Sequence, residues 1–340
     1  MANLSHLPLN RRNKETRYKE TAHDFPTSES ENGLILKMTI AGLEQVAQKP
    51  ANTSKPVVTF IVGQPAAGKS RMIERLQQER PGVMIDSDEI RQMHPRVDEI
   101  VAHDPVRWDV LANAPVGYVV PRVLDWARGE GYNVYLENTL TNPDQVRQTI
   151  DEFRQAGYKV ELAVIAVPEI MSRISIGIRY ARGLHRHDGR PRWTALAAHD
   201  TAYQAIPDGV SQLAGAADTV SVWNRMGKLW EGKGDRAAEA LAVLDAERHR
   251  TLHPAEEEDF VFETASMMDD VYTLAEGDII VETLLDRVEA DLQEAGLHQR
   301  VMETVPMVAW TDKGRAVRRQ PPPESNDGGR HNGRTRGPTL

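Results

Sequence analysis

The sequence predicts an α/β fold, with a parallel sheet flanked by helices and a helical appendage after it. Three observations support this prediction. Runs of β-branched and aliphatic residues alternate with helical patterns between about residues 57 and 233. These runs are continuous, as in strands buried on both faces. Strand signals stop near residue 234, and only helical patterns follow. Such alternation favours parallel strands joined by crossover helices.

Five segments are expected to form the strands of this sheet. The first, VVTFIV, is the most apolar, and the others are shorter or interrupted by polar residues. The predicted strands are 57–62, 83–85, 133–137, 159–167 and 219–223. The predicted helices between them are 116–130, 143–156, 168–181 and 194–205.

The composition excludes several classes of protein. The 340 residues contain no cysteine, so disulfides, thiolate zinc sites and a catalytic thiol are excluded. No apolar run approaches the roughly 18 residues of a membrane span, and the amino terminus lacks a secretory signal pattern. The net charge of −9 argues against a general nucleic-acid binder. We expect a cytoplasmic protein without a membrane anchor.

An eight-residue motif is the strongest local signal. It matches G-x-x-x-x-G-K-[ST], follows the strand 57–62 directly and opens a helical run. Such a loop wraps phosphates with backbone N–H groups, its lysine reaches the β- and γ-phosphates, and its hydroxyl binds Mg²⁺. We therefore expect ATP and Mg²⁺ as cofactors, Ser70 as the metal ligand and a nucleotide-binding loop formed by Gly63, Gln64, Pro65, Ala66, Ala67, Gly68, Lys69 and Ser70.

Acidic residues follow two of the predicted strands. Asp86-Ser87-Asp88 comes after strand 83–85, and Glu137 ends strand 133–137. The carboxyl ends of parallel strands line the ligand crevice, and transfer to a hydroxyl needs a carboxylate base. An aspartate here could equally cap the next helix, so one residue could cap and the other catalyse. Glu137 is harder to explain structurally, and we expect it to have a functional role.

The segment 178–192 carries five arginines and two histidines with interspersed glycines. Phosphoryl transfer needs cations around the transferring group, so this segment could form a mobile lid. An exposed basic loop is the alternative reading, and neither histidine has a metal-ligand context.

Taken together, these motifs resemble the zeta-toxin family of P-loop kinases. The matching pieces, in order from about residue 57 to 230, are GQPAAGKS, IDSDEIRQMHP, YLENT, AVPE, IRY and AHD. The resemblance implies a kinase that phosphorylates a hydroxyl of a nucleotide-activated amino sugar such as UDP-N-acetylglucosamine. It also implies a toxin–antitoxin system with a small helical antitoxin as partner.

The resemblance also implies roles for individual residues. Asp88 matches the general base, and Arg179 and Arg192 match the pair of arginines on the γ-phosphate. With Lys69 these form the expected catalytic set, and the substrate-binding residues are expected to be Asp88, His94, Glu137 and Thr139.

Three departures fall on the acceptor side of the family pattern. Asn138 replaces a glycine, Thr141 stands where an arginine is often found, and Pro121 stands at the position of a glutamate. Alternative functions therefore stay open: phosphorylation of another hydroxylated metabolite or antibiotic, a nucleotide-dependent binding module with little turnover, or nucleic-acid binding through the tails.

The predicted organisation has four parts. Residues 1–50 form a polar arm with one helix at 34–48, which could cover the ATP site, and residues 51–233 form the P-loop kinase domain. Residues 234–310 form three acidic helices, either a solvated appendage or a binding module. Residues 311–340 hold seven Lys/Arg against three Asp/Glu and are expected to be a disordered basic tail.

Overall fold

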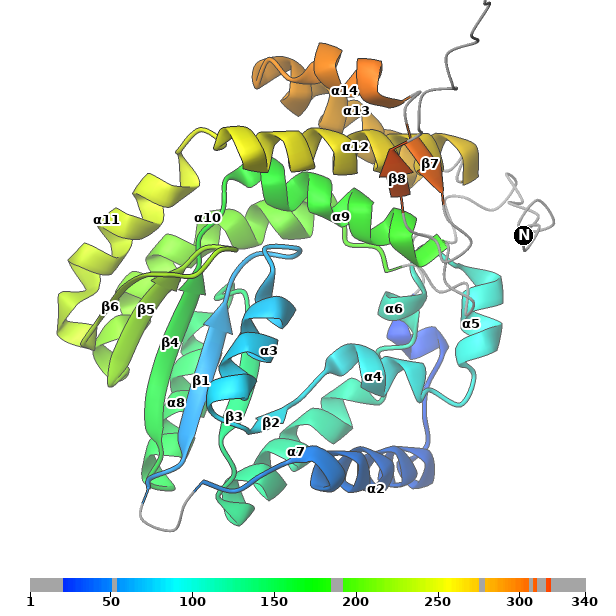
Figure 1. Ribbon diagram of the computed structural model, residues 1–340. Coiled ribbons are helices and arrows are strands. Elements are labelled where there is room, and N and C mark those ends of the chain that lie inside the picture. Colours follow the sequence, from blue (N-terminus) through cyan, green and yellow to red (C-terminus); the bar gives the residue numbers. More distant parts are fainter. Residues whose placement is uncertain are drawn as a thin grey trace, which may run out of the picture.

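A six-stranded sheet forms the centre of the protein (Figure 1). The computed structural model describes residues 21–50, 54–184, 192–274, 279–305, 308–310 and 316–318. The sheet has the order β2-β3-β1-β4-β5-β6, in which only the pairing of β5 with β6 is antiparallel. The strands are β1 (Val57–Val62), β2 (Val83–Met84), β3 (Val134–Asn138), β4 (Lys159–Ile165), β5 (Thr219–Trp223) and β6 (Lys228–Gly232).

Helices cover both faces of the sheet and extend beyond one end of it (Figure 1). In the first half of the chain they are α2 (Glu29–Val46), α3 (Lys69–Glu79), α4 (Ser87–Gln92), α5 (Val97–His103), α6 (Trp108–Leu111), α7 (Val116–Glu130) and α8 (Pro143–Gln155), with a 3₁₀ turn η3 (Ala22–Asp24). In the second half they are α9 (Glu169–Leu184), α10 (Leu196–Leu213), α11 (Ala237–Arg248), α12 (Pro254–Leu274), α13 (Ile279–Glu294) and α14 (His298–Thr304), with turns η4 (Ala214–Ala216) and η5 (Gly234–Arg236). No helix of the described ranges is both long and apolar enough to cross a membrane.

The predicted α/β class and all five predicted strands are confirmed. Val57–Val62 is buried at every position, as a central strand with helices on both faces must be. The sequence did not predict β6, a short and largely exposed edge strand of sequence KLWEG. The prediction that strands stop after residue 234 was also incomplete, because β7 (Val308–Trp310) and β8 (Ala316–Arg318) form a small hairpin. Residues 316–318 of the predicted tail are thus ordered, and residues 319–340 lie outside the described ranges.

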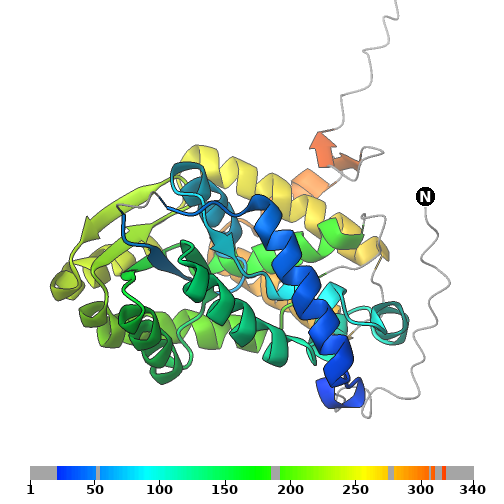
Figure 2. The ribbon, with the colours of Figure 1, turned by 90° about the horizontal axis from the view of Figure 1, so that it is seen from below.

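The described part of the predicted N-terminal arm, residues 21–50, packs on the domain. Helix α2 begins at the capping residue Ser28 and runs along α7, where Ile35 is buried in the main core (Figure 2). Phe25 enters a smaller core formed with α5 and α6. None of residues 21–48 lines the cleft described below, so this part of the arm does not cover the nucleotide site as hypothesised. Residues 1–20 lie outside the described ranges.

The C-terminal helices form a second layer on α9. Apolar residues of α12 and α13 build one core with those of α9, including Ile174, Met267 and Leu284. Helix α12 lies above α9 in Figure 1, on the side of the domain opposite α2. The predicted three helices are present, followed by the short α14, and they bury an apolar face against the kinase domain.

Candidate active site

The phosphate-binding loop lies between β1 and α3, at the carboxyl edge of the sheet. Gly68 is the N-cap of α3 with φ 112°, a left-handed conformation that glycine adopts without strain. Ala66 also has a positive φ, of 60°. The loop is tied to the sheet by the Gly63 N–H, which donates to Asn138 O at 3.1 Å. The unpaired N–H groups at the start of α3 therefore face the cleft, as an anion site requires.

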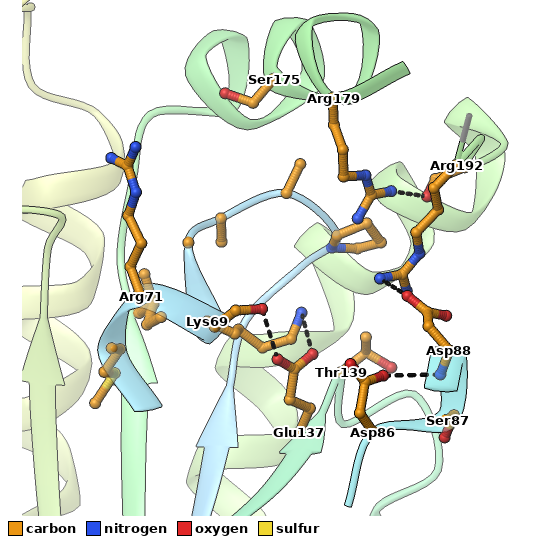
Figure 3. Close-up of a pocket in the computed structure, with 18 of the residues that line it drawn as sticks. Lys69, Arg71, Asp86, Ser87, Asp88, Glu137, Thr139, Ser175, Arg179 and Arg192 are labelled. Carbon is orange, nitrogen blue, oxygen red and sulfur yellow. Dashed lines mark hydrogen bonds and ion pairs between the residues drawn. The ribbon is translucent and has the colours of Figure 1, made fainter. Parts of the chain in front are cut away.

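Lys69 is held inside this loop. Its Nζ donates to the carbonyl oxygens of Gly63 and Gln64 at 3.0 and 3.2 Å and lies 3.9 Å from Glu137 Oε2 (Figure 3). Burial lowers the pKa of Lys69 to about 8, because the charge of Glu137 offsets only part of the desolvation. Lys69 is therefore a desolvated cation aimed at the phosphate position.

Ser70 and Glu137 are also in contact. The Ser70 hydroxyl donates to Glu137 Oε1 at 3.2 Å. Glu137 is close to both loop residues because β3 lies beside β1, with Glu137 in register with Ile61. The predicted substrate residue thus lies against the P-loop, next to the predicted metal ligand.

The two aspartates of the DSD segment have different roles. Asp86 is the N-cap of α4, and its Oδ1 accepts the Asp88 N–H at 2.7 Å. The Asp88 carboxylate faces the cleft instead and pairs with Arg91 at 2.5 Å and with Arg192 (Figure 3). Asp109 of α6, which the sequence did not single out, lies close by, and burial raises the pKa of its carboxyl.

Two arginines approach the same space from the opposite side (Figure 3). Arg179 comes from α9 and donates to Thr194 Oγ1 at 2.5 Å. Its burial and the neighbouring Arg192 lower its pKa to about 10. The Nε atoms of Arg179 and Arg192 are buried and have no hydrogen-bond partner. Buried donors without a partner cost free energy, and an oxyanion in the cleft would supply the missing acceptors. Residues 185–191 of the expected lid lie outside the described ranges.

These groups line one open cleft of about 920 Å³. The predicted residues that the structure brings together along it are Pro65, Ala66, Ala67, Gly68, Lys69, Ser70, Asp88, Glu137, Thr139, Arg179 and Arg192. Three predicted residues do not line it, namely Gly63, Gln64 and His94. Gln64 turns its side chain away and donates to Ser172 Oγ at 3.0 Å. His94 is buried, and its ring nitrogens contact Phe25 O and the Arg96 N–H. His94 therefore lies outside the cleft lining and holds the N-terminal segment, and its role in substrate binding stays a prediction.

The acceptor-side departures are smaller than the sequence suggested. The Asn138 Oδ1 accepts the Leu140 N–H at 2.7 Å, which stabilises a turn in which Leu140 has a φ of 54°. This side chain therefore folds back on its own loop. Pro121 is exposed within α7 and does not line the cleft.

Sequence reasoning missed the groups at the other end of the cleft. Arg225 donates to Ala66 O at 3.1 Å and to Ser175 Oγ at 2.9 Å, and burial lowers its pKa. Arg225 lies just after β5, at the carboxyl edge of the sheet, and this position in the sequence could have identified it as a site residue. Glu263 of α12 lines the cleft and pairs with Arg182. Nothing in the pattern of α12 marks Glu263.

The residues present fit a magnesium–nucleotide ligand. A desolvated lysine, unpaired N–H groups of α3 and two arginine Nε donors without partners suit a polyphosphate. The hydroxyl of Ser70 and the carboxylate of Glu137 are the oxygen donors that Mg²⁺ prefers.

Proteins of known sequence and structure resemble this chain. "Toxin zeta" of Enterococcus hirae is 27% identical over 219 residues, 62% of this chain and 75% of that protein. "Toxin PezT" of Streptococcus pneumoniae is 26% identical over 195 residues, 56% of this chain and 74% of that protein. A structure from the PezAT chromosomal toxin–antitoxin system of S. pneumoniae superposes with a TM-score of 0.60 and 21% identity, covering 74% of this chain and 99% of that chain. A structure of AvrRxo1-ORF1:AvrRxo1-ORF2 with sulphate ions superposes with a TM-score of 0.53 and 12% identity, covering 76% and 88%.

The family model described as Zeta toxin matches residues 43–235, which is more than half of the chain. This range contains the sheet, the P-loop, Asp88 and both cleft arginines. The chain belongs to the zeta-toxin family of kinase-like proteins with a P-loop fold.

Proposed function

We propose that this protein transfers the γ-phosphoryl group of ATP to a hydroxyl of a nucleotide-activated amino sugar such as UDP-N-acetylglucosamine. The observation that carries the proposal is the arrangement around the P-loop. Lys69, Arg179, Arg192 and the Asp88 carboxylate all line the same cleft, and Asp88 pairs with Arg192. A transfer site needs both cations for the phosphoryl group and a base for the hydroxyl.

Each group has a distinct task in the proposed reaction. The P-loop and Lys69 bind the β- and γ-phosphates, and Ser70 with Glu137 would hold Mg²⁺, which neutralises charge on those phosphates. Arg179 and Arg192 bind the γ-phosphoryl oxygens. Asp88 accepts the proton of the attacking hydroxyl. For this, Arg192 leaves Asp88 and binds the γ-phosphate, and the acceptor hydroxyl takes the place of Arg192 beside Asp88.

The acceptor hydroxyl and its sugar would lie on the Asp88 side, near Thr139. The Thr139 hydroxyl lies 3.3 Å from that of Thr141, and Thr139 lines the cleft. Since Asn138 folds back on its own loop, it leaves space for a sugar nucleotide. Another hydroxylated metabolite or antibiotic is the second candidate acceptor, because Thr141 stands where relatives often carry an arginine.

We also propose that the protein acts as the toxin of a toxin–antitoxin system in the cytoplasm. Support comes from relatives named Toxin zeta and Toxin PezT and from the structure described for the PezAT toxin–antitoxin system. The corresponding partner would be a small helical antitoxin. A binding module with little turnover is disfavoured, since it has no need for a carboxylate in the same cleft as the phosphate-binding lysine.

A panel assay tests the acceptor. Purified protein is incubated with ATP, Mg²⁺ and individual UDP-sugars or unrelated hydroxylated metabolites, and products are examined by mass spectrometry for one added phosphoryl group. Lys69→Ala serves as the inactive control. Modification of UDP-N-acetylglucosamine or a related UDP-sugar is the expected result. Consumption of ATP with only another metabolite would overturn the sugar-nucleotide assignment, and ATP binding without any transfer would overturn the kinase assignment.

A further inference from the structure

Helix α9 has two functional faces. Ser172, Ser175 and Arg179 are spaced three and four residues apart, so they share one face. Ser172 accepts a hydrogen bond from Gln64, and Ser175 accepts one from Arg225, which also binds the loop carbonyl of Ala66. These contacts fix α9 to the P-loop. The same face then presents Arg179 to the cleft (Figure 3).

The opposite face of α9 rests on the C-terminal helices. A Cβ added to Gly177 would lie 2.9 Å from Met267 Sδ and 3.0 Å from Leu284 Cδ2, so α12 and α13 approach the α9 backbone closely. Arg173, four residues earlier on this face, is 3% exposed and donates to Asp291 of α13 at 2.6 Å. Asp291 is itself buried. The back of α9 thus combines tight packing with a buried ion pair.

Arg173 also joins this ion pair to the P-loop. It pairs with Glu169 of α9 and, at 3.2 Å, with Asp200 of α10. Asp200 lies 2.9 Å from His199 Nδ1, and His199 Nε2 lies 2.9 Å from Ser172 Oγ, which accepts from Gln64. A continuous chain of hydrogen bonds therefore runs from α13 to the loop.

A side-chain cation, Arg173, already lies within this cluster of carboxylates. The ring and carboxylate atoms of Glu169, His199 and Asp200 are close enough to hold a metal ion. The guanidinium of Arg173 already contacts both carboxylates, however, and supplies the positive charge. Burial lowers the pKa of His199, so the ring is neutral and links Asp200 to Ser172. The cluster is suited to hold helices in place.

We infer that the C-terminal helices position Arg179 for phosphoryl transfer, with Arg173 and Asp291 as the positioning residues. The inference rests on the proposed function for its kinetic consequence. Removing the α13 carboxylate leaves Arg173 without its buried partner on that side. Helix α9 then loses a support directly behind the face that carries Arg179. Misplacing a catalytic group by about 1 Å can cost on the order of 10²-fold in rate.

The test compares Asp291→Asn with Arg287→Ala. Arg287 is an exposed residue of α13 that contacts the same Asp291 at 3.2 Å without reaching α9, so it is a matched control. We expect Asp291→Asn to lower kcat at least about tenfold with little change in KM for ATP. Arg287→Ala should retain wild-type kinetics. In an Arg179→Ala background, Asp291→Asn should have little further effect on kcat, because the arginine that Asp291 helps to position is already absent.

A distance measurement tests the positioning without relying on activity. The chain has no cysteine, so Glu74→Cys on α3 and Arg182→Cys on α9 can be spin-labelled specifically. Asp291→Asn should broaden the distance distribution between the labels relative to the same pair with Arg287→Ala. An unchanged distance distribution would overturn the inference. The inference would also be overturned if Asp291→Asn lowered kcat by the same factor in the Arg179→Ala background as in the wild type. Wild-type protein that binds ATP but transfers nothing would instead overturn the proposed function, and the distance measurement would still decide the positioning role.

Discussion

Lys69→Met should stabilise the fold while it abolishes ATP binding. Lys69 is 10% exposed, and its ordinary pKa of 10.5 falls to about 8 in the folded protein. The difference of about 2.5, at about 1.4 kcal/mol for each pKa unit, means that the charge costs roughly 3 kcal/mol at pH 7. Methionine removes this cost but loses the two hydrogen bonds to Gly63 O and Gln64 O, each worth about 1 kcal/mol net. The expected gain is about 1 kcal/mol.

Thermal unfolding measures this gain. For a chain of this size, about 1 kcal/mol raises Tm by roughly 1.5 °C. The pKa of Lys69 is lowered by folding, so its charge destabilises the fold fully below pH 8 and progressively less as the pH rises toward 10.5. The gain in Tm should therefore shrink above pH 8. Lys37→Met, at an exposed position of α2, is the control and should change stability by less than about 0.5 kcal/mol. A Tm for Lys69→Met at or below the wild-type value at pH 7 would refute the reasoning.

Two further predictions follow from the same geometry. ATP affinity, measured by calorimetry, should fall up to tenfold per pH unit above about pH 8, because ATP binds protonated Lys69 and binding above that pH requires the uptake of a proton. The Lys69→Arg variant should show no such fall, and an ATP affinity of the wild type that does not change with pH would contradict the role of Lys69 in ATP binding. Gly234→Ala should destabilise the fold by about 3 kcal/mol, because the added Cβ would lie 2.0 Å from Ala214 O. Gly215→Ala places its Cβ in open space and should leave the Tm in thermal unfolding nearly unchanged. Equal Tm values for these two alanine variants would show that the close approach at Gly234 is not maintained.

The sequence predicted those features whose signals are local. The buried strand 57–62 and the P-loop motif each occupy consecutive residues, so the central strand and the phosphate site could be located. Asp88 and the two arginines followed from a family resemblance that the family match confirms, and their individual roles stay predictions. Their assembly in one cleft agrees with the principle that ligands bind at the carboxyl edge of a parallel sheet.

The features that escaped prediction depend on contacts between distant residues. Arg173 and Asp291 are 118 positions apart, and nothing in either segment indicates the other. His94 lies in one of the motifs that match the family, yet its ring nitrogen Nε2 contacts the carbonyl oxygen of Phe25, 69 residues earlier in the sequence. Strand β6 was missed because an exposed edge strand lacks the apolar run that marks a buried one.

Comparison of Asp88→Asn with wild type tests the central claim most directly. The measurement is the rate of phosphoryl transfer to the accepted sugar nucleotide at saturating ATP and acceptor, with ATP affinity determined in parallel. The substitution keeps the side-chain shape and removes the base, so the rate should fall by about 10²- to 10⁴-fold while ATP affinity changes little. Near-wild-type turnover by Asp88→Asn would contradict the assignment of Asp88 as the base that activates the acceptor hydroxyl.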